Sequence, residues 1–302
     1  MSREHMRAFR DVPGVRLAGV HSRTRARAEA LAAEFGAGVV ADSVAELHAK
    51  TGARLVVVSV PELAANAVLR ECFRHDWTVL AEKPVGYDVA DAESIRAEAA
   101  RLRRRAYAAL NRRHYSATRL ARQRLEADPG PRFIRVQDQQ DPAAALAAGQ
   151  PPKVVENWMY ANSIHVIDYF RVFGRGEVTE VVPVVRWNPA RPAWVVAKVG
   201  FSSGDLGLYE GVWDGPGPWA VTASTPSQRL EMRPLEQLGL QKRGERRLEP
   251  QPAHEWDGAF KAGFRAQAEQ AAAAARGEPA ELPTLEDALA SMKLVQRIFA
   301  RA

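Results

Sequence analysis

The chain has 302 residues, of which 46% are hydrophobic and 26% charged, and its formal net charge at pH 7 is +6. This length exceeds what a single hydrophobic core usually fills, so two domains are predicted. No apolar run approaches the roughly 20 residues of a membrane span, and the first ten residues lack the apolar stretch of an export signal. Cys72 is the single cysteine and has no partner for an internal disulfide. We therefore expect a cytoplasmic protein without membrane contact, in which Cys72 is a small buried hydrophobe.

The positive charge raises the question of nucleic-acid binding, because a basic face is the usual footprint of phosphate recognition. The basic residues are spread along the chain, and the densest cluster, 101–105, lacks the interleaved aromatic residues of a base-stacking surface. We expect no nucleic-acid partner, and we predict no metal site.

The first part of the chain alternates short β-branched runs with amphipathic segments, which is typical of a parallel sheet covered by helices. Gly36 is placed to close the first predicted helix in a left-handed conformation, and the Ser43/Glu46 spacing predicts a capping box. The valine-rich run 55–60 is typical of a strand buried on both faces, and Pro61 ends it. In chain order the predicted elements are strand 15–20, helix 24–35, strand 39–41, helix 43–50, strand 55–60, a helix from Pro61 to about 74, strand 78–81, helix 90–104 and strand 106–110.

The pattern then changes to longer alternating runs, which favour an open, mostly antiparallel sheet. Gly174 closes the second of the predicted helices, and segments 141–152 and 215–218 are predicted as loops because they are rich in Pro, Gly and Gln. The domain boundaries are therefore set at 1–113 and 114–302. Beyond 113 the predicted helices are 116–127, 162–173, 257–276 and 285–299, and the predicted strands are 133–137, 178–186, 194–201, 207–213 and 219–223.

Six segments together resemble one protein family. They are VLAEKPVG at 79–86, VRLAGVHSRTRARAEALAAEFG at 15–36, LVVVSVP at 55–61, LNRR at 110–113, SIHVIDYFRVFG at 163–174 and PTLEDALASMKLV at 283–295. In this order they resemble the Gfo/Idh/MocA oxidoreductases. The resemblance implies an α/β Rossmann-type domain that binds NAD or NADP, followed by an α+β domain with an open sheet that binds substrate and forms a homodimer or homotetramer. It also implies hydride transfer to or from a sugar, an inositol or a nucleotide sugar.

Two residues are predicted to carry the chemistry. Lys83 follows Glu82 at the end of a parallel strand, where ligands of open α/β sheets bind, and its ammonium suits polarising a carbonyl or orienting a hydroxyl. His165 matches the histidine of the family at the opening of a helix, and an imidazole suits proton transfer in both directions. A solvated lysine and a structurally satisfied histidine are the alternatives.

The cofactor contacts are predicted at the strand ends. Ser22 and Arg23 follow the second family strand, where an acidic residue would select NAD, whereas serine and arginine suit a 2′-phosphate; we therefore favour NADP over NAD. The resemblance further assigns Ser59, Pro61, Glu82, Lys83 and Asn111 to the cofactor.

The substrate contacts are predicted mainly in the second domain. Trp158 and Tyr160 are interpreted either as an aromatic wall for a sugar ring or as packing between the domains. Asn162 and Asp168 are interpreted as polar neighbours of His165, and Arg113 is assigned to a substrate phosphate. The family usually has an aspartate four residues before the histidine, but this sequence has Ala161. Either His165 carries more of the proton transfer or the chemistry has changed.

The first strand and the GxGxxG loop of a dinucleotide site are not found before residue 3, where the sequence already resembles the interior of the first helix. A start position set too late, or a truncated chain, is one explanation. Otherwise the strands at 15–20 and 55–60 must pair with each other or be completed elsewhere. Three functions remain open: an NADP-preferring dehydrogenase or reductase, a cofactor-free binding or regulatory homologue, and a glycoside-cleaving enzyme that uses NAD transiently.

Overall fold

The computed structural model describes residues 1–300 and divides into two compact units. Unit 1 consists of Met1–His114 and Trp256–Leu289, and unit 2 consists of Tyr115–Glu255 and the chain from Ala290 onwards. The change of pattern predicted near residue 113 therefore marks the end of the first segment of unit 1. The second segment of unit 1, Trp256–Leu289, could not be predicted from the sequence, because an alanine-rich helix has the same periodicity in either unit.

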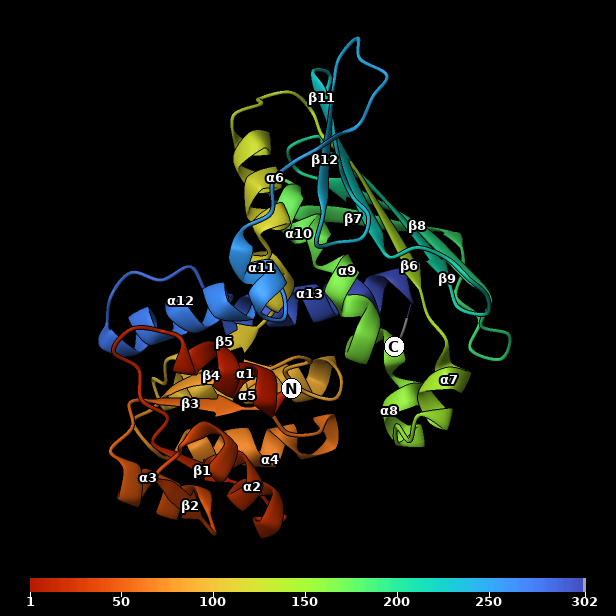
Figure 1. The fold of residues 1–302 in the computed structure, drawn as a ribbon. Coiled ribbons are helices and arrows are strands. Elements are labelled where there is room, and N and C mark those ends of the chain that lie inside the picture. Colours follow the sequence, from red (N-terminus) through yellow and green to blue (C-terminus); the bar gives the residue numbers. More distant parts are fainter. Residues whose placement is uncertain (301–302) are drawn as a thin grey trace. The chain divides into compact units, whose positions relative to one another are not determined.

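Unit 1 begins with the helix α1 and continues as an alternation of short strands and helices (Figure 1). Its elements are α1 Ser2–Arg10, β1 Gly19–His21, α2 Arg25–Phe35, β2 Val39–Ala41, α3 Val44–Thr51, β3 Leu55–Val58, α4 Glu62–Cys72, β4 Thr78–Glu82, α5 Val89–Arg101, β5 Ala106–Ala109, the 3-10 turn η1 Asn111–His114, most of α11 Glu255–Ala259, α12 Phe264–Arg276 and the start of α13 Leu285–Ile298. Gly36 closes α2 in the left-handed conformation, as predicted. The Ser43 side chain caps α3, accepting from the amide of Glu46. Glu46 itself accepts from the amide of Asp42 and not from that of Ser43.

The five strands of unit 1 form two parallel sheets. β1 pairs with β2, and β4 lies between β3 and β5. Within the described part of the chain no ladder joins β1 to β3, which excludes direct pairing, one of the two alternatives considered for the strands at 15–20 and 55–60. The strand at 15–20 is also shorter than predicted, since pairing begins at Gly19.

The burial predicted for the valine-rich strand is wrong in part. Val58 is buried, but Leu55, Val56 and Val57 are only partly buried. The reason is that β3 is an edge strand, paired with β4 on one side, whereas β4 is paired on both sides and buried from Thr78 to Ala81. A run of valines indicates a strand but not its position in a sheet.

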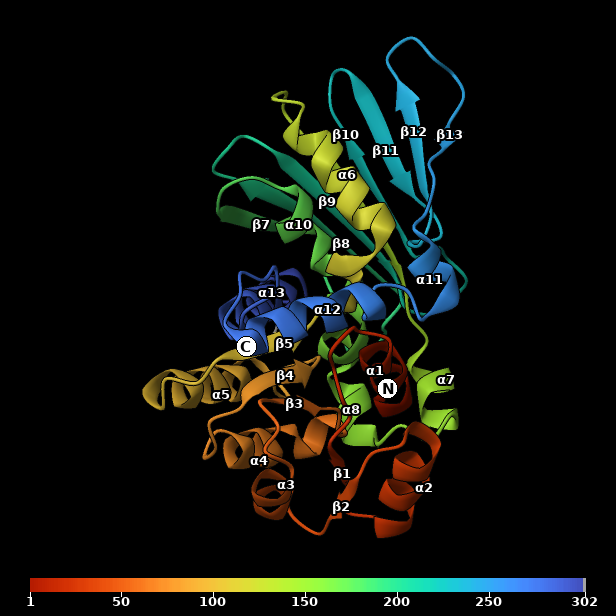
Figure 2. The same ribbon diagram turned by 60° about the vertical axis from the view of Figure 1, so that its left-hand side comes forward.

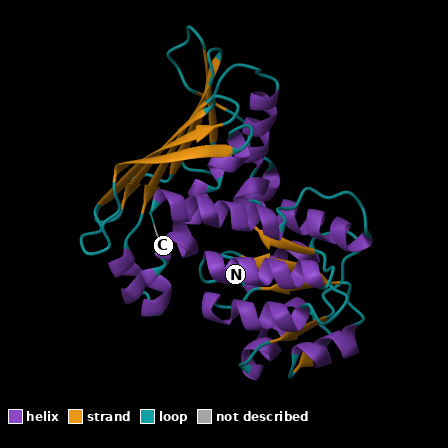
Figure 3. Cartoon of the chain, turned by 180° about the vertical axis from the view of Figure 1, so that it is seen from behind, coloured by secondary structure: helices purple, strands orange, loops and turns teal. Residues whose placement is uncertain are grey.

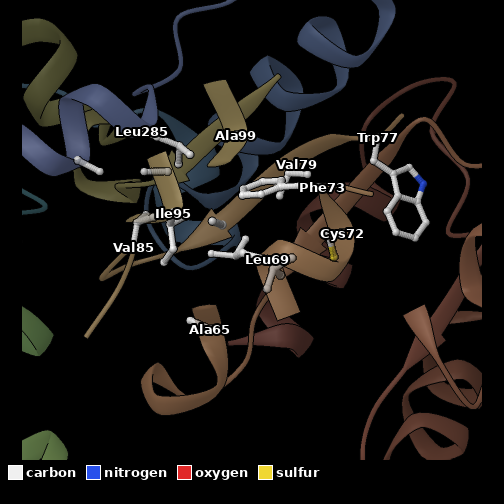
Figure 4. Packing of buried hydrophobic residues seen from close by; sticks show 14 of the residues in the cluster. Ala65, Leu69, Cys72, Phe73, Trp77, Val79, Val85, Ile95, Ala99 and Leu285 are labelled. Atoms are coloured by element: carbon white, nitrogen blue, oxygen red, sulfur yellow. The ribbon is translucent and has the colours of Figure 1, made fainter. Parts of the chain in front are cut away.

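Helices cover both faces of the three-stranded sheet. On one face Leu69 of α4, Phe73 directly after that helix and Ile95 of α5 form a core with Val79 (Figure 4). On the other face Ala8 and Phe9 of α1 pack with the alanines of α12 and with Leu80. Cys72 is 1% exposed in the first core, and burial raises the pKa of its thiol to about 12, so the prediction that Cys72 is a small buried hydrophobe is confirmed.

Unit 2 is built around one large sheet (Figure 2). Its elements are α6 Ser116–Glu126, β6 Phe133–Gln139, α7 Pro142–Ala147, α8 Pro152–Glu156, the π-helical turn η2 Met159–Ser163, α9 Ile164–Ile167, α10 Tyr169–Phe173, β7 Val178–Val185, β8 Trp194–Phe201, β9 Leu206–Val212, β10 Ala220–Ser224, β11 Gln228–Met232, β12 Leu238–Lys242, β13 Glu249–Pro250 and the remainder of α13. The segment predicted as a loop at 141–152 contains α7, whose first turn is capped by Asp141 and begins with Pro142; a proline at that position starts a helix. The helix predicted at 162–173 is broken into η2, α9 and α10.

Within residues 1–300 the sheet has eight strands in the order β13-β12-β11-β10-β6-β9-β8-β7. Every pair is antiparallel except β6 with β9, which confirms the predicted open, mostly antiparallel sheet. The strands β11, β12 and β13 were not predicted, because β11 and β12 alternate over only five residues each and β13 spans two. Helices cover one face, as the colouring in Figure 3 shows, while the other face exposes Val182, Val184 and Trp194.

No helix in the described residues combines the length and the apolar character needed to cross a membrane.

Candidate functional site

The predicted residues of unit 1 follow the carboxyl ends of its parallel strands. Ser22 and Arg23 follow β1, Ser59 follows β3, and Lys83 follows β4. β1 belongs to the two-stranded sheet, and β3 and β4 belong to the three-stranded one. In each parallel sheet the carboxyl ends of the strands lie at one edge, which is where open α/β folds bind ligands. The Ser2 hydroxyl lies 3.4 Å from Ser59 Oγ, so the amino end of α1 reaches this edge of the three-stranded sheet. Helix amino ends favour anions.

Lys83 is the most perturbed of these groups. Burial lowers the pKa of its ammonium to about 8, the adjacent Glu82 carboxylate opposes this shift, and Arg112 and Lys261 add to it. An amine with such a pKa exists in both protonation states near neutral pH and is suited to exchange a proton or to donate a strong hydrogen bond.

Gly86 shapes the turn that follows Lys83. Its φ is +111°, and a Cβ at this position would lie 2.6 Å from the amide nitrogen of Ala92. Glycine is therefore required where the chain leaves β4 for α5, and the segment around Lys83 has one defined path.

Glu82 has a buried partner that sequence reasoning did not identify. His5 Nε2 lies 2.7 Å from Glu82 Oε1, and the two side chains are 4% and 12% exposed. Burial raises the pKa of Glu82, but the hydrogen bond and charge of His5, with Lys83, outweigh it and leave the pKa below its usual value. The His5 ring also packs against Phe264, 4.8 Å between centroids. The sequence feature that could have indicated the burial of His5 is its position on the same helix face as Ala8 and Phe9.

The other predicted residues of unit 1 differ in accessibility. Asn111 is buried and donates to the carbonyl of Ala262 at 3.1 Å. Arg113 faces Asp287 at 3.9 Å. Ser22 accepts a hydrogen bond from the amide of Thr24, whereas Arg23 is exposed. Pro61 is exposed at the N-cap of α4.

The donors of unit 1 fit parts of a nicotinamide dinucleotide. A hydroxyl and an exposed guanidinium, from Ser22 and Arg23, suit the adenosine ribose and a 2′-phosphate, and the amino end of α1 suits a pyrophosphate. Ser59 and Lys83 follow the strands that would border the nicotinamide.

The predicted residues of unit 2 gather around η2 and α9. Trp158 and Asn162 both donate to the side-chain oxygen of Gln140, each at 2.8 Å. Tyr160 and Ala161 are buried. His165 is partly exposed, and its ring lies 6.2 Å from that of Trp219.

Asp168 occupies a different environment from the other polar residues of this segment. It is 4% exposed and accepts a hydrogen bond of 2.6 Å from Ser291 Oγ. The bond ties α13 to the segment that carries His165, so Asp168 has a structural partner in the core of unit 2.

Unit 2 contains a cavity of about 530 Å³ beside this segment. Trp158 and Asn162, which were predicted, lie in its wall together with Gln139, Gln140 and Trp219, which were not. Sequence reasoning missed the glutamines because they lie at the end of β6 and directly after it, and become neighbours of η2 only through the fold.

The comparisons with known proteins agree with this architecture. Residues 1–109 match the model of the Gfo/Idh/MocA family, described as an oxidoreductase family with an NAD-binding Rossmann fold. None of the curated proteins matches the chain.

Solved structures of several oxidoreductases share the fold of the whole chain. One is a UDP-N-acetylglucosamine 3-dehydrogenase from Acidithiobacillus ferrooxidans, with 18% identity, a TM-score of 0.76 and coverage of 99% of this chain and 93% of that one. A putative NADPH-dependent oxidoreductase from Desulfitobacterium hafniense has 14% identity, a TM-score of 0.83 and coverage of 99% and 92%. A putative myo-inositol dehydrogenase from Sinorhizobium meliloti has 16% identity, a TM-score of 0.76 and coverage of 99% and 94%. At these identities the likeness establishes the fold.

Proposed function

Since residues 1–109 belong to the Gfo/Idh/MocA oxidoreductase family, we propose that the protein transfers a hydride between a nicotinamide dinucleotide and a sugar-like hydroxyl or carbonyl. A bound nicotinamide would donate or accept the hydride at the substrate carbon. The observation that carries the proposal is the partly buried Lys83 with its pKa lowered to about 8, at the end of a strand in an NAD-binding fold.

The protein residues handle the proton in this proposal. During reduction the ammonium of Lys83 donates a hydrogen bond to the carbonyl oxygen, so charge that develops on the oxygen is stabilised. His165 supplies the proton that completes the hydroxyl, and it accepts that proton in the reverse direction. Glu82, held ionised by His5, favours the charged form of Lys83. We place the reaction in the cytoplasm.

NADP is the cofactor we propose, because Ser22 and Arg23 follow β1. The name of the Desulfitobacterium hafniense structure, which includes NADPH, supports this choice. Of the other two names, that of the Acidithiobacillus ferrooxidans structure supports a nucleotide sugar as substrate, and that of the Sinorhizobium meliloti structure supports an inositol.

The test combines cofactor binding with turnover. The full chain is titrated with NADPH and NADH by nicotinamide fluorescence, and sugars and inositols are then screened for oxidation or reduction. We expect Lys83→Met to lower kcat by about 10²- to 10⁴-fold, because it removes the proposed hydrogen-bond donor to the carbonyl oxygen. The matched control is Lys242→Met, which changes an exposed lysine of β12.

The pH profile adds a second readout. Because the ammonium is the active form in reduction, kcat for reduction should fall as pH rises through about 8, and kcat for oxidation should rise over the same range. Unchanged kcat in Lys83→Met would remove Lys83 from the mechanism.

A cofactor-free binding or regulatory homologue is the second candidate. The feature that favours it is the division of the strands of unit 1 into two sheets, since a dinucleotide site of this fold normally spans one continuous sheet. Ala161, at a position where the family usually has an aspartate, also favours it. Failure to bind either nucleotide, with ligand binding retained, would establish this alternative.

A further inference from the structure

The cavity of unit 2 has a wall of indoles and side-chain amides. It is lined by Trp158, Trp219, Gln139, Gln150 and Asn162, with Asp141 at its edge. Its volume of about 530 Å³ is within the range of small-molecule sites. The ring of Trp219 also lies 6.2 Å from that of His165, so the cavity adjoins the residue proposed to transfer the proton.

Both indole N–H groups in the wall are already bonded to the protein. Trp158 Nε1 donates to Gln140 Oε1 at 2.8 Å, and Trp219 Nε1 donates to the carbonyl of Gln139 at 2.7 Å. What each indole offers a ligand is therefore its ring surface, which suits the C–H faces of a saturated ring. The amides of Gln150 and Asn162 supply donors and acceptors that suit ring hydroxyls.

The charges near the cavity are negative. Asp141 is in the wall, and the buried Asp138 accepts a hydrogen bond from Gln140 Nε2 at 2.5 Å. A phosphate in this cavity would be repelled by the Asp141 carboxylate in the wall, with the buried Asp138 carboxylate beside Gln140, whereas a neutral ring would meet no such repulsion. A neighbouring pocket has Gly217 and Trp219 in common with the cavity and is also lined by Arg233. If the ligand carried a phosphate, the guanidinium of Arg233 would be the cation expected to bind it.

A buried hydrogen-bond network holds the wall in place. Gln140 is 1% exposed, and its side-chain oxygen accepts from both Trp158 and Asn162. Its amide nitrogen donates to Asp138, which accepts a second bond of 2.7 Å from the Tyr209 hydroxyl. Burial, with the nearby Asp138, raises the pKa of Tyr209 well above its usual value, so the hydroxyl remains a donor.

We propose that this cavity binds a neutral polyhydroxylated ring, a free sugar or a cyclitol, in preference to a phosphorylated or nucleotide-linked sugar, and that Gln140 positions its Trp158 and Asn162 wall. The inference rests on the proposed function, because it names the substrate class of the same reaction. The resemblance implies sugars, inositols or nucleotide sugars as substrates. The inference keeps sugars and inositols as candidate substrates and excludes nucleotide sugars.

The ligand test uses the full chain and tryptophan fluorescence, in the absence and presence of NADPH. The probes are glucose, galactose and myo-inositol, with glucose 6-phosphate and a UDP-hexose as the charged arm. We expect at least one neutral ring to bind at least about tenfold more tightly than either charged probe. Tighter binding of a charged probe overturns the inference and leaves hydride transfer standing, as does binding of NADPH without binding of any ring. Binding of a neutral ring without any nucleotide keeps the subsite and overturns the proposed reaction.

Variants of Trp158 test whether the sugar ring binds against this indole, and variants of Gln140 distinguish a positioning role from a role in folding. Trp158→Ala should weaken binding of the neutral ring at least about tenfold, while Trp158→Phe, which keeps an aromatic face, should stay within about threefold of the wild type. Equal affinity of Trp158→Ala and the wild type would overturn the inference.

Gln140→Met keeps the length of the side chain and removes both acceptor and donor. It should raise KM for the ring about tenfold or more with kcat changed less than about threefold and the Kd for NADPH unchanged, and Gln140→Asn should recover part of this loss. Gln237→Ala, at an exposed glutamine, is the matched control. A fall in kcat with KM unchanged, or equal affinity for the ring in folded Gln140→Met, would refute the positioning role.

Discussion

At the scale of single residues, the candidate site of unit 1 consists of side chains at the strand ends and of the partners that these side chains contact. Lys83 and Glu82 were predicted from the EKP triplet after a strand, and both lie where expected on β4 and directly after it. His5 was not predicted as the partner of Glu82, because a histidine on a helix has no sequence signal for a carboxylate 77 residues away. Local sequence patterns therefore predict candidate site residues, but they do not predict the partners that contact these residues from distant parts of the chain.

The His5–Glu82 pair should be important for stability. We expect His5→Ala to lower the free energy of unfolding by about 2–4 kcal/mol, because it leaves a buried carboxylate without its partner. His5→Gln, which can still donate to Glu82, should lose less, and His254→Ala is a surface control. Urea unfolding measures the difference.

The same pair has a defined pH dependence. Because the pKa of Glu82 is lowered in the folded protein, the carboxylate stabilises the fold above its ordinary pKa of 4.5, and this contribution is lost as pH falls below it. The gap between wild type and His5→Ala should narrow at acidic pH. A gap of less than about 0.5 kcal/mol at pH 7 would show that the pair does not stabilise the protein.

Arg23 provides the test of cofactor preference. Its guanidinium is exposed after β1, and we expect Arg23→Ala to weaken NADPH at least about tenfold while the Kd for NADH changes by less than about twofold. Arg27→Ala, one turn further along on the exposed side of α2, should change neither. Equal losses for the two nucleotides would mean that Arg23 does not contact a 2′-phosphate.

At the scale of elements, sequence identified most helices and strands but not how the strands pair. The segments at 39–41 and 194–201 coincide with β2 and β8, whereas the run 55–60 gave a strand without revealing its edge position. Periodicity reports which side chains face a core, but pairing depends on neighbours distant in sequence. For the same reason the contact of Gln140 with η2 could not be predicted.

Edge position should be visible in hydrogen exchange. β4 is paired on both sides and buried, whereas β3 is paired on one side and β1 belongs to a two-stranded sheet. We expect hydrogen-bonded amides of β4 to exchange at least about 100-fold more slowly than those of β1 and β3, because local opening breaks fewer contacts in the edge strands. Mass spectrometry of peptides covering 17–22, 54–60 and 77–83 measures this, and uniform protection of the three would contradict it.

At the scale of the whole molecule, one face of the large sheet of unit 2 is covered by helices, whereas the other exposes apolar side chains to solvent. Trp194 and Val184 are each 64% exposed there, and the face also has the pairs Arg135–Glu210 and Lys198–Glu180. We propose that a second copy of the chain covers it, because a face with both charges and apolar groups can be self-complementary across a two-fold axis.

Disruption of this face tests the proposal. Trp194→Glu should raise the dimer dissociation constant at least about 100-fold in sedimentation velocity, because it places a charge in an apolar contact. Leu146→Glu changes an apolar residue of α7 that is 45% exposed and should leave the dimer intact. A wild-type protein that is monomeric at about 100 µM would refute the proposal.

The division of the chain between its units affects the order of folding during synthesis. Part of the core of unit 1 is made by Ala8 and Phe9 together with α12, whose first residue is Phe264, and this unit extends to Leu289. The ribosome must therefore synthesise α12, which follows most of unit 2 in the chain, before the first unit has all of its core. The long segment of unit 2, Tyr115–Glu255, is synthesised before that point, so this protein should depart from the usual order in which amino-terminal domains fold first.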